Sequence, residues 1–305
     1  MKKIAFIGLG NMGLPMAGNL VKAGFEVRGF DTAPGALAAA RAAGIETAPT
    51  AEDAVKDAAA VVTMLPNGAI LRKVYAEIVP AAKAGALLID CSTVDVASSR
   101  AAHEAAGKAG LKSVDAPVSG GVGGAAAATL TFMAGGAREA FEEACPVLSA
   151  MGKNLVYCGG AGAGQAAKIC NNMVLGISMI GVCEAFALAD KLGLSRQAMF
   201  DVVSTSSGQC WSINTYCPAP GIGPKSPADN DYKPGFAAAL MLKDLNLSQE
   251  AAASAGAETP LGGHAAELYA RFVAEGGADK DFSGVLPWLA AMTRTASAAP
   301  QERKE

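Results

Sequence analysis

Three polar side chains share one face at the start of a long apolar segment. Asn171 and Asn172 follow Lys168 by three and four residues, and these spacings bring side chains together on a helix. Buried polar groups need partners, so this face predicts a site. Burial also lowers the pKa of a lysine from about 10.4 toward neutrality, which suits Lys168 to work as a general acid or base. A surface lysine that reaches into solvent is the alternative.

A glycine-rich turn near the N-terminus has the spacing of a dinucleotide-binding loop. It follows the apolar run Lys3–Ile7 and precedes a helical pattern. The three glycines allow a tight turn, a close approach to a pyrophosphate and close packing of helix on strand. Phosphates would meet N–H groups at the helix N-terminus. An ordinary strand–helix turn is the alternative. The cofactor contacts expected in this loop are Gly8, Gly10, Asn11, Met12 and Gly13.

An acidic residue ends the next predicted strand. Asp31 comes 18 residues after Gly13, close to the spacing of the residue that binds the adenosine ribose. A carboxylate there can accept a bond from the 2′-hydroxyl and would repel a 2′-phosphate. Thr32 and Ala33 follow, with no arginine to hold such a phosphate. The sequence therefore predicts NAD rather than NADP.

Two further strand ends carry candidate contacts to the nicotinamide ribose. Leu65 and Pro66 end one apolar run, and Thr93 follows another. Ligands of open parallel sheets bind at the carboxyl ends of the strands, which is where these residues are expected. Thr93 could instead be the N-cap of a helix at Asp95, and the pattern does not decide between the two.

A second glycine-rich run, Asp115–Gly124, also follows a predicted strand. The hydroxyl of Ser119 and the backbone N–H groups of Gly120 and Gly121 could hold a small carboxylate. A flexible surface loop without a ligand is the alternative.

The remaining lysine and histidine candidates are less specific. Lys243 lies in an apolar helical segment, and the adjacent Asp244 does not share its face. A role at the site and an interdomain salt bridge both fit Lys243. The two histidines, His103 and His264, have no acid–base context, and His103 is expected on an exposed helix. No metal site is expected, because no two of the seven cysteines have the spacing of a zinc motif.

Composition limits the class of protein. The 305 residues predict two domains, and the net charge of −3 without a basic run argues against nucleic-acid binding. The apolar stretch Met173–Ala189 contains Glu184, which argues against a membrane span. We expect a cytoplasmic protein whose cysteines are buried free thiols.

Strand-like and helix-like segments alternate over about the first 160 residues, which predicts a parallel sheet covered on both faces. The helical stretches include Met12–Ala23, Glu52–Lys56 and Val96–Ala109. The expected strands are Lys3–Ile7, Phe25–Phe30, Ala59–Leu65, Ala86–Asp90, Lys112–Asp115, Leu130–Ala134 and Asn154–Cys158.

The pattern changes at the glycine-rich segment Gly159–Gly164, beyond which no strand is expected. The chain therefore divides into an α/β Rossmann domain, Met1–Gly162, and an all-α domain, Ala163–Glu305. A long loop is expected at Ser206–Gly235. The helices expected in the second domain are Gln165–Leu192, a helix capped by Ser195 that ends near Ser204, Phe236–Ala255, Pro260–Ala274 and Leu286–Arg294.

Four separated motifs together resemble the β-hydroxyacid dehydrogenase family, and within it the enzymes that act on 3-hydroxyisobutyrate. The long loop from Ser206 to Tyr232 also looks like the loop of those enzymes. The motifs are Ile7–Gly13, Asp115–Gly121, Gly162–Asn172 and Lys243–Leu245.

The resemblance implies a function and a set of residue roles. It implies NAD-dependent oxidation of a small 3-hydroxy acid, 3-hydroxyisobutyrate to methylmalonate semialdehyde in valine catabolism, by a homodimer or homotetramer. Lys168 would be the acid–base group, and Ser119, Gly120, Gly121 and Asn172 would bind the substrate. Thr93 and Lys243 would complete the cofactor and substrate contacts. A tartronate or succinate semialdehyde reductase and a non-catalytic dinucleotide-binding protein are the alternatives.

Overall fold

The computed structural model describes residues 3–296, and the side chains of residues 3–292. The chain forms two compact units that divide between Ile169 and Cys170. This division falls inside helix α8 (Ala163–Leu192). The boundary suggested by the sequence, after Gly162, immediately precedes the same helix and stays a prediction.

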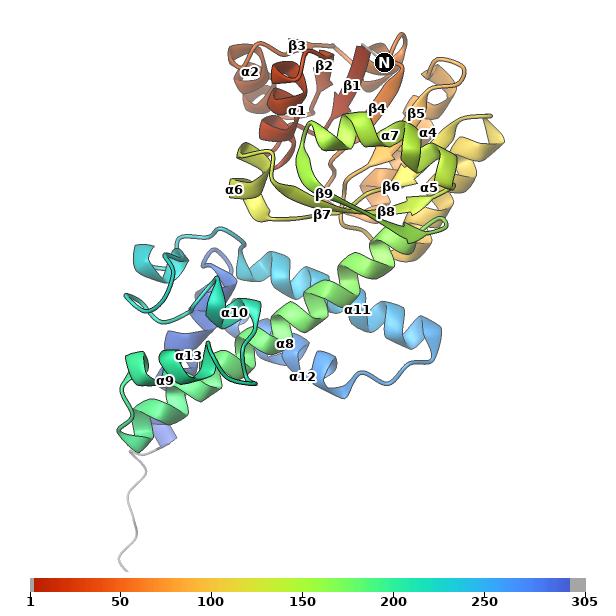
Figure 1. Ribbon diagram of the computed structural model, residues 1–305. Coiled ribbons are helices and arrows are strands. Elements are labelled where there is room, and N and C mark those ends of the chain that lie inside the picture. The colour runs from red at the N-terminus through yellow and green to blue at the C-terminus, as the bar shows by residue number, and fades with distance from the viewer. Residues whose placement is uncertain (1–2, 297–305) are drawn as a thin grey trace, which may run out of the picture. The chain divides into compact units, whose positions relative to one another are not determined.

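Strands and helices alternate through the first unit (Figure 1). The helices are α1 (Gly13–Lys22), α2 (Pro34–Ala42), α3 (Ala51–Val55), α4 (Gly68–Ala81), α5 (Val96–Lys108), α6 (Gly121–Ala126) and α7 (Arg138–Ser149). The strands are β1 (Lys3–Ile7), β2 (Glu26–Phe30), β3 (Glu46–Thr47), β4 (Ala60–Thr63), β5 (Leu87–Asp90), β6 (Lys112–Asp115), β7 (Val118–Ser119), β8 (Leu130–Gly136) and β9 (Gly152–Gly159). Every strand expected from the sequence is present, and the two-residue strands β3 and β7 were not expected.

The sheet has the strand order of a doubly wound dinucleotide-binding domain. Its order is β3-β2-β1-β4-β5-β6-β8-β7, and β9 pairs with β8. Strands β1 to β6 run parallel. The order reverses between β1 and β4, and ligands of such sheets bind at this point, outside the carboxyl ends of the strands.

Apolar side chains on alternate residues of the strands enter two separate cores. Ile4 and Phe6 of β1 pack in one core with Met16 and Leu20 of α1. Ala5 and Ile7 point to the other face, where the core includes side chains of α4 and α5. Both faces of the sheet are therefore covered, which confirms that part of the prediction.

The expectation of a purely parallel sheet is wrong at one edge. Strand β8 runs antiparallel to β6 and to β7. A parallel neighbour needs a crossover of a dozen or more residues that returns the chain to the starting edge. Helix α6, the only helix between β7 and β8, has 6 residues and is too short for that return.

In its described residues the second unit consists of helices joined by loops, and its one β-type pairing is an isolated bridge between Ala237 and Asp281. Its core includes Phe186 of α8, Met241 and Leu245 of α11, and Tyr269 of α12. Beyond α8 its elements are α9 (Arg196–Val203), α10 (Trp211–Asn214), η1 (Pro227–Asn230), α11 (Ala238–Ala255), α12 (Pro260–Phe272), the π-helical turn η2 (Val273–Gly277), η3 (Phe282–Gly284) and α13 (Val285–Ala296).

The helices expected in this unit are present, and Ser195 caps α9 by accepting a bond from the Ala198 N–H. The expected loop Ser206–Gly235 contains two short helical turns, α10 and η1. Helix α8 is long and apolar enough to cross a membrane by length and composition alone. Its residues Met179, Cys183 and Phe186 are fully buried in the second core, as expected of the central helix of a globular unit.

Candidate functional site

The parallel strands align the candidate residues at one edge of the sheet. Ile7, the last residue of β1, pairs with Phe30 and with Thr63 at the ends of β2 and β4. Thr63 pairs with Asp90, and Asp90 pairs with Asp115. The segments after these five residues carry the glycine loop, Asp31, Leu65, Thr93 and Ser119. The register therefore gathers most of the predicted site of the first unit along its carboxyl edge.

The backbone of the glycine loop requires glycine at particular positions. Gly8 has φ +95°, and its N–H donates to the Phe30 carbonyl at 2.9 Å. A Cβ at Gly13 would collide with the Gly8 carbonyl oxygen, whereas a Cβ at Gly10 would point into open space. No side chain caps helix α1 at Met12. The loop thus leaves a helix N-terminus without a side-chain cap beside Gly10, an arrangement that can receive an anion.

Asp31 is fixed beside this loop by two backbone donors. Its Oδ2 accepts from the Leu9 N–H at 2.7 Å, and its Oδ1 accepts from the Ala33 N–H at 2.8 Å. The first bond ties the carboxylate to the glycine loop itself. Both carboxylate oxygens of Asp31 are therefore held in a fixed orientation.

The segments after β4 and β5 are joined through Ser92. The Ser92 hydroxyl accepts from the Leu65 N–H at 2.8 Å and donates to Asp90 Oδ1 at 2.6 Å. Thr63 Oγ1 donates to the same carboxylate oxygen at 2.7 Å. Burial raises the pKa of the Asp90 carboxyl to about 6, and this effect outweighs the hydrogen bonds from Ser92 and Thr63, which lower the pKa.

Thr93 is not the N-cap of the helix that follows it. Asp95 caps α5 by accepting a bond from the Ser98 N–H at 2.7 Å. The capping alternative for Thr93 is therefore wrong, and its half-buried side chain lies at the carboxyl edge after β5. Pro66 is exposed at the neighbouring strand end.

The turn after β7 also has a backbone that favours glycine. Gly120 and Gly121 have φ +133° and +61°, and helix α6 begins at Gly121. Ser119 is the last residue of β7 and is half-buried, whereas Gly120 is exposed. The turn is therefore the junction between a strand and a helix, with a backbone conformation that favours glycine at both positions.

Lys168 is buried, with 7% of its surface exposed, so it is not a solvated surface lysine. It lies in the second turn of α8, three residues after Gln165. The side chain of Gln165 is fully buried and bonds to the backbone at Ser92 and Val94, which flank Thr93. Sequence reasoning did not single out Gln165, although it lies within the motif Gly162–Asn172.

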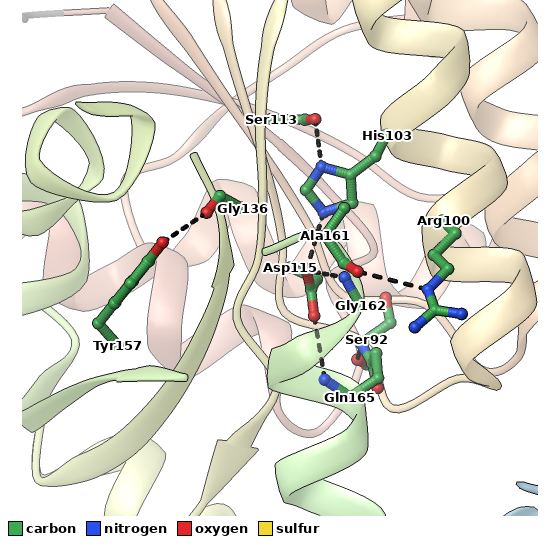
Figure 2. A network of polar contacts seen from close by, with 10 residues as sticks. All are labelled: Ser92, Arg100, His103, Ser113, Asp115, Gly136, Tyr157, Ala161, Gly162 and Gln165. Atoms are coloured by element: carbon green, nitrogen blue, oxygen red, sulfur yellow. Dashed lines mark hydrogen bonds and ion pairs between the residues drawn. The ribbon is translucent and has the colours of Figure 1, made fainter. Parts of the chain in front are cut away.

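A buried carboxylate holds the start of α8, and sequence reasoning missed its role. Asp115 accepts from the N–H groups of Gly162 at 2.8 Å and Gln165 at 3.0 Å (Figure 2). His103 Nε2 lies 2.8 Å from Asp115 Oδ1, and His103 Nδ1 lies 2.6 Å from Ser113 Oγ. The expectation that His103 is exposed and without polar context is therefore wrong. Helix α5 is rich in alanine, so its sequence shows little difference in hydrophobicity between the buried and the exposed face.

In the second unit, Asn172 is held between two polar neighbours. Its Nδ2 donates to Asp244 Oδ2 at 2.5 Å, and its Oδ1 accepts from Asn171 at 3.0 Å. Asp244 is 4% exposed, and the preceding Lys243 is half-buried on the same helix, α11. The sequence singled out Asn172 and Lys243 but not the carboxylate that fixes Asn172.

The described residues contain no group of three or more His, Cys, Asp or Glu side chains placed to hold a metal ion. All seven cysteines are free thiols. Only Cys91, Cys183 and Cys217 are buried, and Cys170 is exposed, so the expectation of buried thiols holds for those three.

Two family models together match nearly the whole chain. Residues 3–160 match the NAD binding domain of 6-phosphogluconate dehydrogenase. Residues 162–289 match a domain described as the NAD-binding domain of NADP-dependent 3-hydroxyisobutyrate dehydrogenase. These matches confirm the Rossmann domain followed by a helical domain, and NAD as the cofactor.

Individual relatives cover almost all of the chain. A probable 3-hydroxyisobutyrate dehydrogenase of Mycobacterium tuberculosis is 53% identical over 95% of this chain and 99% of its own length. An NAD-dependent L-serine dehydrogenase of Pseudomonas aeruginosa is 46% identical over 93% of this chain and 97% of its own. A solved structure of the Mycobacterium tuberculosis 3-hydroxyisobutyrate dehydrogenase with L-serine has a TM-score of 0.92, with 53% identity, over 95% of this chain and 99% of that one.

Proposed function

Since this chain belongs to the β-hydroxyacid dehydrogenase family of NAD-binding oxidoreductases, we propose that it oxidises 3-hydroxyisobutyrate to methylmalonate semialdehyde. The observation that carries this proposal is the buried Lys168 on a helix whose start is bonded to the carboxyl edge of the nucleotide-binding sheet. A buried amine beside a dinucleotide site is suited to remove a proton from an alcohol.

The cofactor would be held by the residues of the carboxyl edge. Gly8, Gly10, Asn11, Met12 and Gly13 would hold the pyrophosphate, and Asp31 would accept a bond from the ribose 2′-hydroxyl. Leu65, Pro66 and Thr93 would contact the nicotinamide ribose. Bound NAD supplies the acceptor for the hydride that leaves the hydroxyl-bearing carbon.

The remaining residues would bind the substrate and move its proton. Ser119 and the N–H groups of Gly120 and Gly121 would hold the carboxylate. Lys168, as a neutral amine, would take the hydroxyl proton on Nζ as the C–H bond breaks, which leaves an aldehyde. Asn172 lies four residues along the same helix and would orient the hydroxyl or the amine. Lys243 would complete the contacts to substrate and cofactor.

Replacement of Lys168 tests this mechanism. We expect Lys168→Ala to lower kcat by at least roughly 10²–10⁴-fold, the usual effect of losing a general base. The affinity for NADH should stay within a few-fold of wild type, because the loop Gly8–Gly13 and Asp31 are untouched. Lys191→Ala, at an exposed position in the last turn of the same helix, is the matched control. Turnover by Lys168→Ala at the wild-type rate would remove the lysine from this role, whereas absence of turnover in the wild-type protein would support a non-catalytic function.

L-serine is a second candidate substrate, because it has the same carboxylate and primary alcohol with an amino group in place of the methyl. A relative is named for this activity, and the solved structure of another relative is described as containing L-serine. The test is kcat/KM for a panel of acids with NAD, with tartronate and succinate semialdehydes assayed in the reverse direction with NADH. A higher kcat/KM for serine, or a preference for either semialdehyde, would overturn the proposed substrate.

We further propose a cytoplasmic homodimer or homotetramer. The free thiols agree with a reducing compartment. Helix α8 exposes Val174, Leu188 and Leu192, each 60% or more accessible, and exposed apolar side chains of this size favour subunit contacts. Light scattering after size exclusion would measure the assembly, and a monomer at micromolar concentration would contradict it.

A further inference from the structure

The side-chain amide of Gln165 makes two hydrogen bonds with the backbone on either side of Thr93, as a neighbouring strand would. Its Nε2 donates to the Ser92 carbonyl at 2.7 Å, and its Oε1 accepts from the Val94 N–H at 3.1 Å. Both bonds are buried, and Gln165 has no exposed surface. The primary amide thus satisfies the backbone on both sides of Thr93 and fixes the position of that residue.

The same segment is fixed to the neighbouring strand end. The Ser92 hydroxyl accepts from the Leu65 N–H and donates to Asp90, so one serine joins the ends of β4 and β5. Leu65 and Thr93 are both proposed cofactor contacts. A displacement of Gln165 would therefore move two segments that are proposed to contact the cofactor, the one at Leu65 and the one at Thr93.

The other end of Gln165 is fixed by Asp115. The carboxylate accepts from the backbone N–H of Gln165 and from that of Gly162, which places the first turn of α8 at the end of β6 (Figure 2). Negative charge at a helix N-terminus is favourable, and these bonds satisfy N–H groups that the helix leaves open. A Cβ added at Gly135 would lie 2.6 Å from Asp115 Oδ1 and 2.7 Å from the Gly164 nitrogen. The contact between β8, Asp115 and the start of α8 is therefore closely packed.

Lys168 follows Gln165 by three residues and shares its face of α8. We propose that Gln165 is a positioning residue that holds the Thr93 segment and Lys168 in one fixed arrangement, so that the cofactor contacts and the proton acceptor keep their relative positions during the reaction. This inference rests on the roles proposed above for Thr93 and Lys168. Gln165 itself touches neither substrate nor cofactor in this scheme.

Gln165→Met tests the inference, because methionine has a similar length and no amide. A catalytic geometry displaced by about 1 Å loses roughly 10²-fold in rate, so we expect kcat to fall between 10- and 100-fold. The KM for the acid should change less than threefold. The primary isotope effect on kcat with substrate deuterated at the hydroxyl-bearing carbon should increase. Gln249→Met is the matched control, since that amide bonds to Thr259 in the second unit. It should lose similar stability and keep its kcat.

A double-mutant cycle separates positioning from general destabilisation. In a Thr93→Ala background, Gln165→Met should lower kcat by clearly less than it does in the wild-type background, because one of the two side chains that Gln165 positions is gone. Wild-type kcat in Gln165→Met, or an undiminished effect in the Thr93→Ala background, would overturn the inference. Gln165→Asn keeps the amide but is one methylene shorter, and it gives the same test if the methionine variant does not fold.

NADH binding, followed by fluorescence, keeps this test apart from the proposed function. If the wild-type protein oxidises none of the acids, the proposed function fails. The link between Gln165 and Thr93 then still predicts that each single variant weakens NADH binding severalfold and that the loss in the double variant is smaller than the two single losses combined. Additive losses of NADH affinity would overturn the inference in that case as well.

Discussion

The preference for NAD over NADP is the prediction for which the structure gives the clearest magnitude. The Asp31 carboxylate is oriented by the N–H groups of Leu9 and Ala33 at 2.7 and 2.8 Å. A hydrogen bond from a ribose hydroxyl to such a charged group contributes about 1.5–3 kcal/mol, or roughly 10- to 150-fold in affinity. A 2′-phosphate about 5 Å from the carboxylate would cost about 3 kcal/mol per unit charge at an effective dielectric constant of about 20. Together these terms predict that the wild-type protein favours NAD by at least roughly 10²-fold.

The perturbation is the pair Asp31→Ser and Thr32→Arg, which removes the repulsion and adds a cation for the phosphate. We expect the ratio of kcat/KM for NAD to that for NADP to fall from at least about 10² to about one or below. Thr32→Arg alone is the control, because it leaves the bond between Asp31 and Leu9 in place. It should shift the ratio by less than the double change. Melting temperatures of all variants show whether loss of that bond also loosens the glycine loop.

The assay needs only initial rates with the two cofactors, and NADH and NADPH titrations give the same ratio for binding alone. Equal use of both cofactors by the wild-type protein would refute the reasoning about Asp31. So would a double variant that keeps the wild-type preference.

Two more predictions concern the ends of the parallel strands. Burial raises the pKa of Asp90 from 3.8 to about 6, so the folded state holds this proton more tightly than the unfolded chain and stability is lost as pH rises through that interval. Between pH 4.5 and 7.5, urea titrations should show wild type losing about 2 kcal/mol relative to Asp90→Asn, and parallel pH profiles would contradict this. Gly8→Ala introduces a Cβ that collides with the Met64 carbonyl at a residue with φ +95°. The Gly8→Ala variant should have a free energy of unfolding lower by about 1–3 kcal/mol and should bind NADH more than tenfold more weakly. Gly24→Ala is the control, because Gly24 has a similar φ of +88° but lies outside the loop and has open space around its Cβ. It should keep wild-type NADH affinity.

Local patterns predicted the parts of this fold that depend on local physics. The strand Lys3–Ile7 and the cap Ser195 were expected at the positions where they occur, because alternation of apolar residues and capping preferences act over a few residues. The antiparallel course of β8 was missed, since the residue pattern of a strand does not give the direction in which it pairs with its neighbours. His103 was expected on an exposed helix, but its side chain bonds to Asp115, because the alanines of this helix give little contrast between its faces.

The candidate site shows the same division. Asp31 and Lys168 stand out in the sequence because a carboxylate after a strand and a lysine in an apolar helix are unusual there. Asp115, Gln165 and Asp244 do not stand out, because their importance lies in bonds to residues 47 to 73 positions away. A bond of that span leaves no periodic or compositional trace in a single sequence.

The motif Gly162–Asn172 is the most specific of the four because one helix must satisfy several separate demands within eleven residues. Its N-terminus must bond to Asp115, and its first turn must insert an amide beside Thr93. Its second turn must bury Lys168, and the next must present Asn172 to Asp244. Helical geometry links these demands, since inserting or deleting one residue would rotate every later side chain by about 100°. These linked demands make the motif Gly162–Asn172 more specific than the glycine loop, whose requirements any dinucleotide-binding domain can meet.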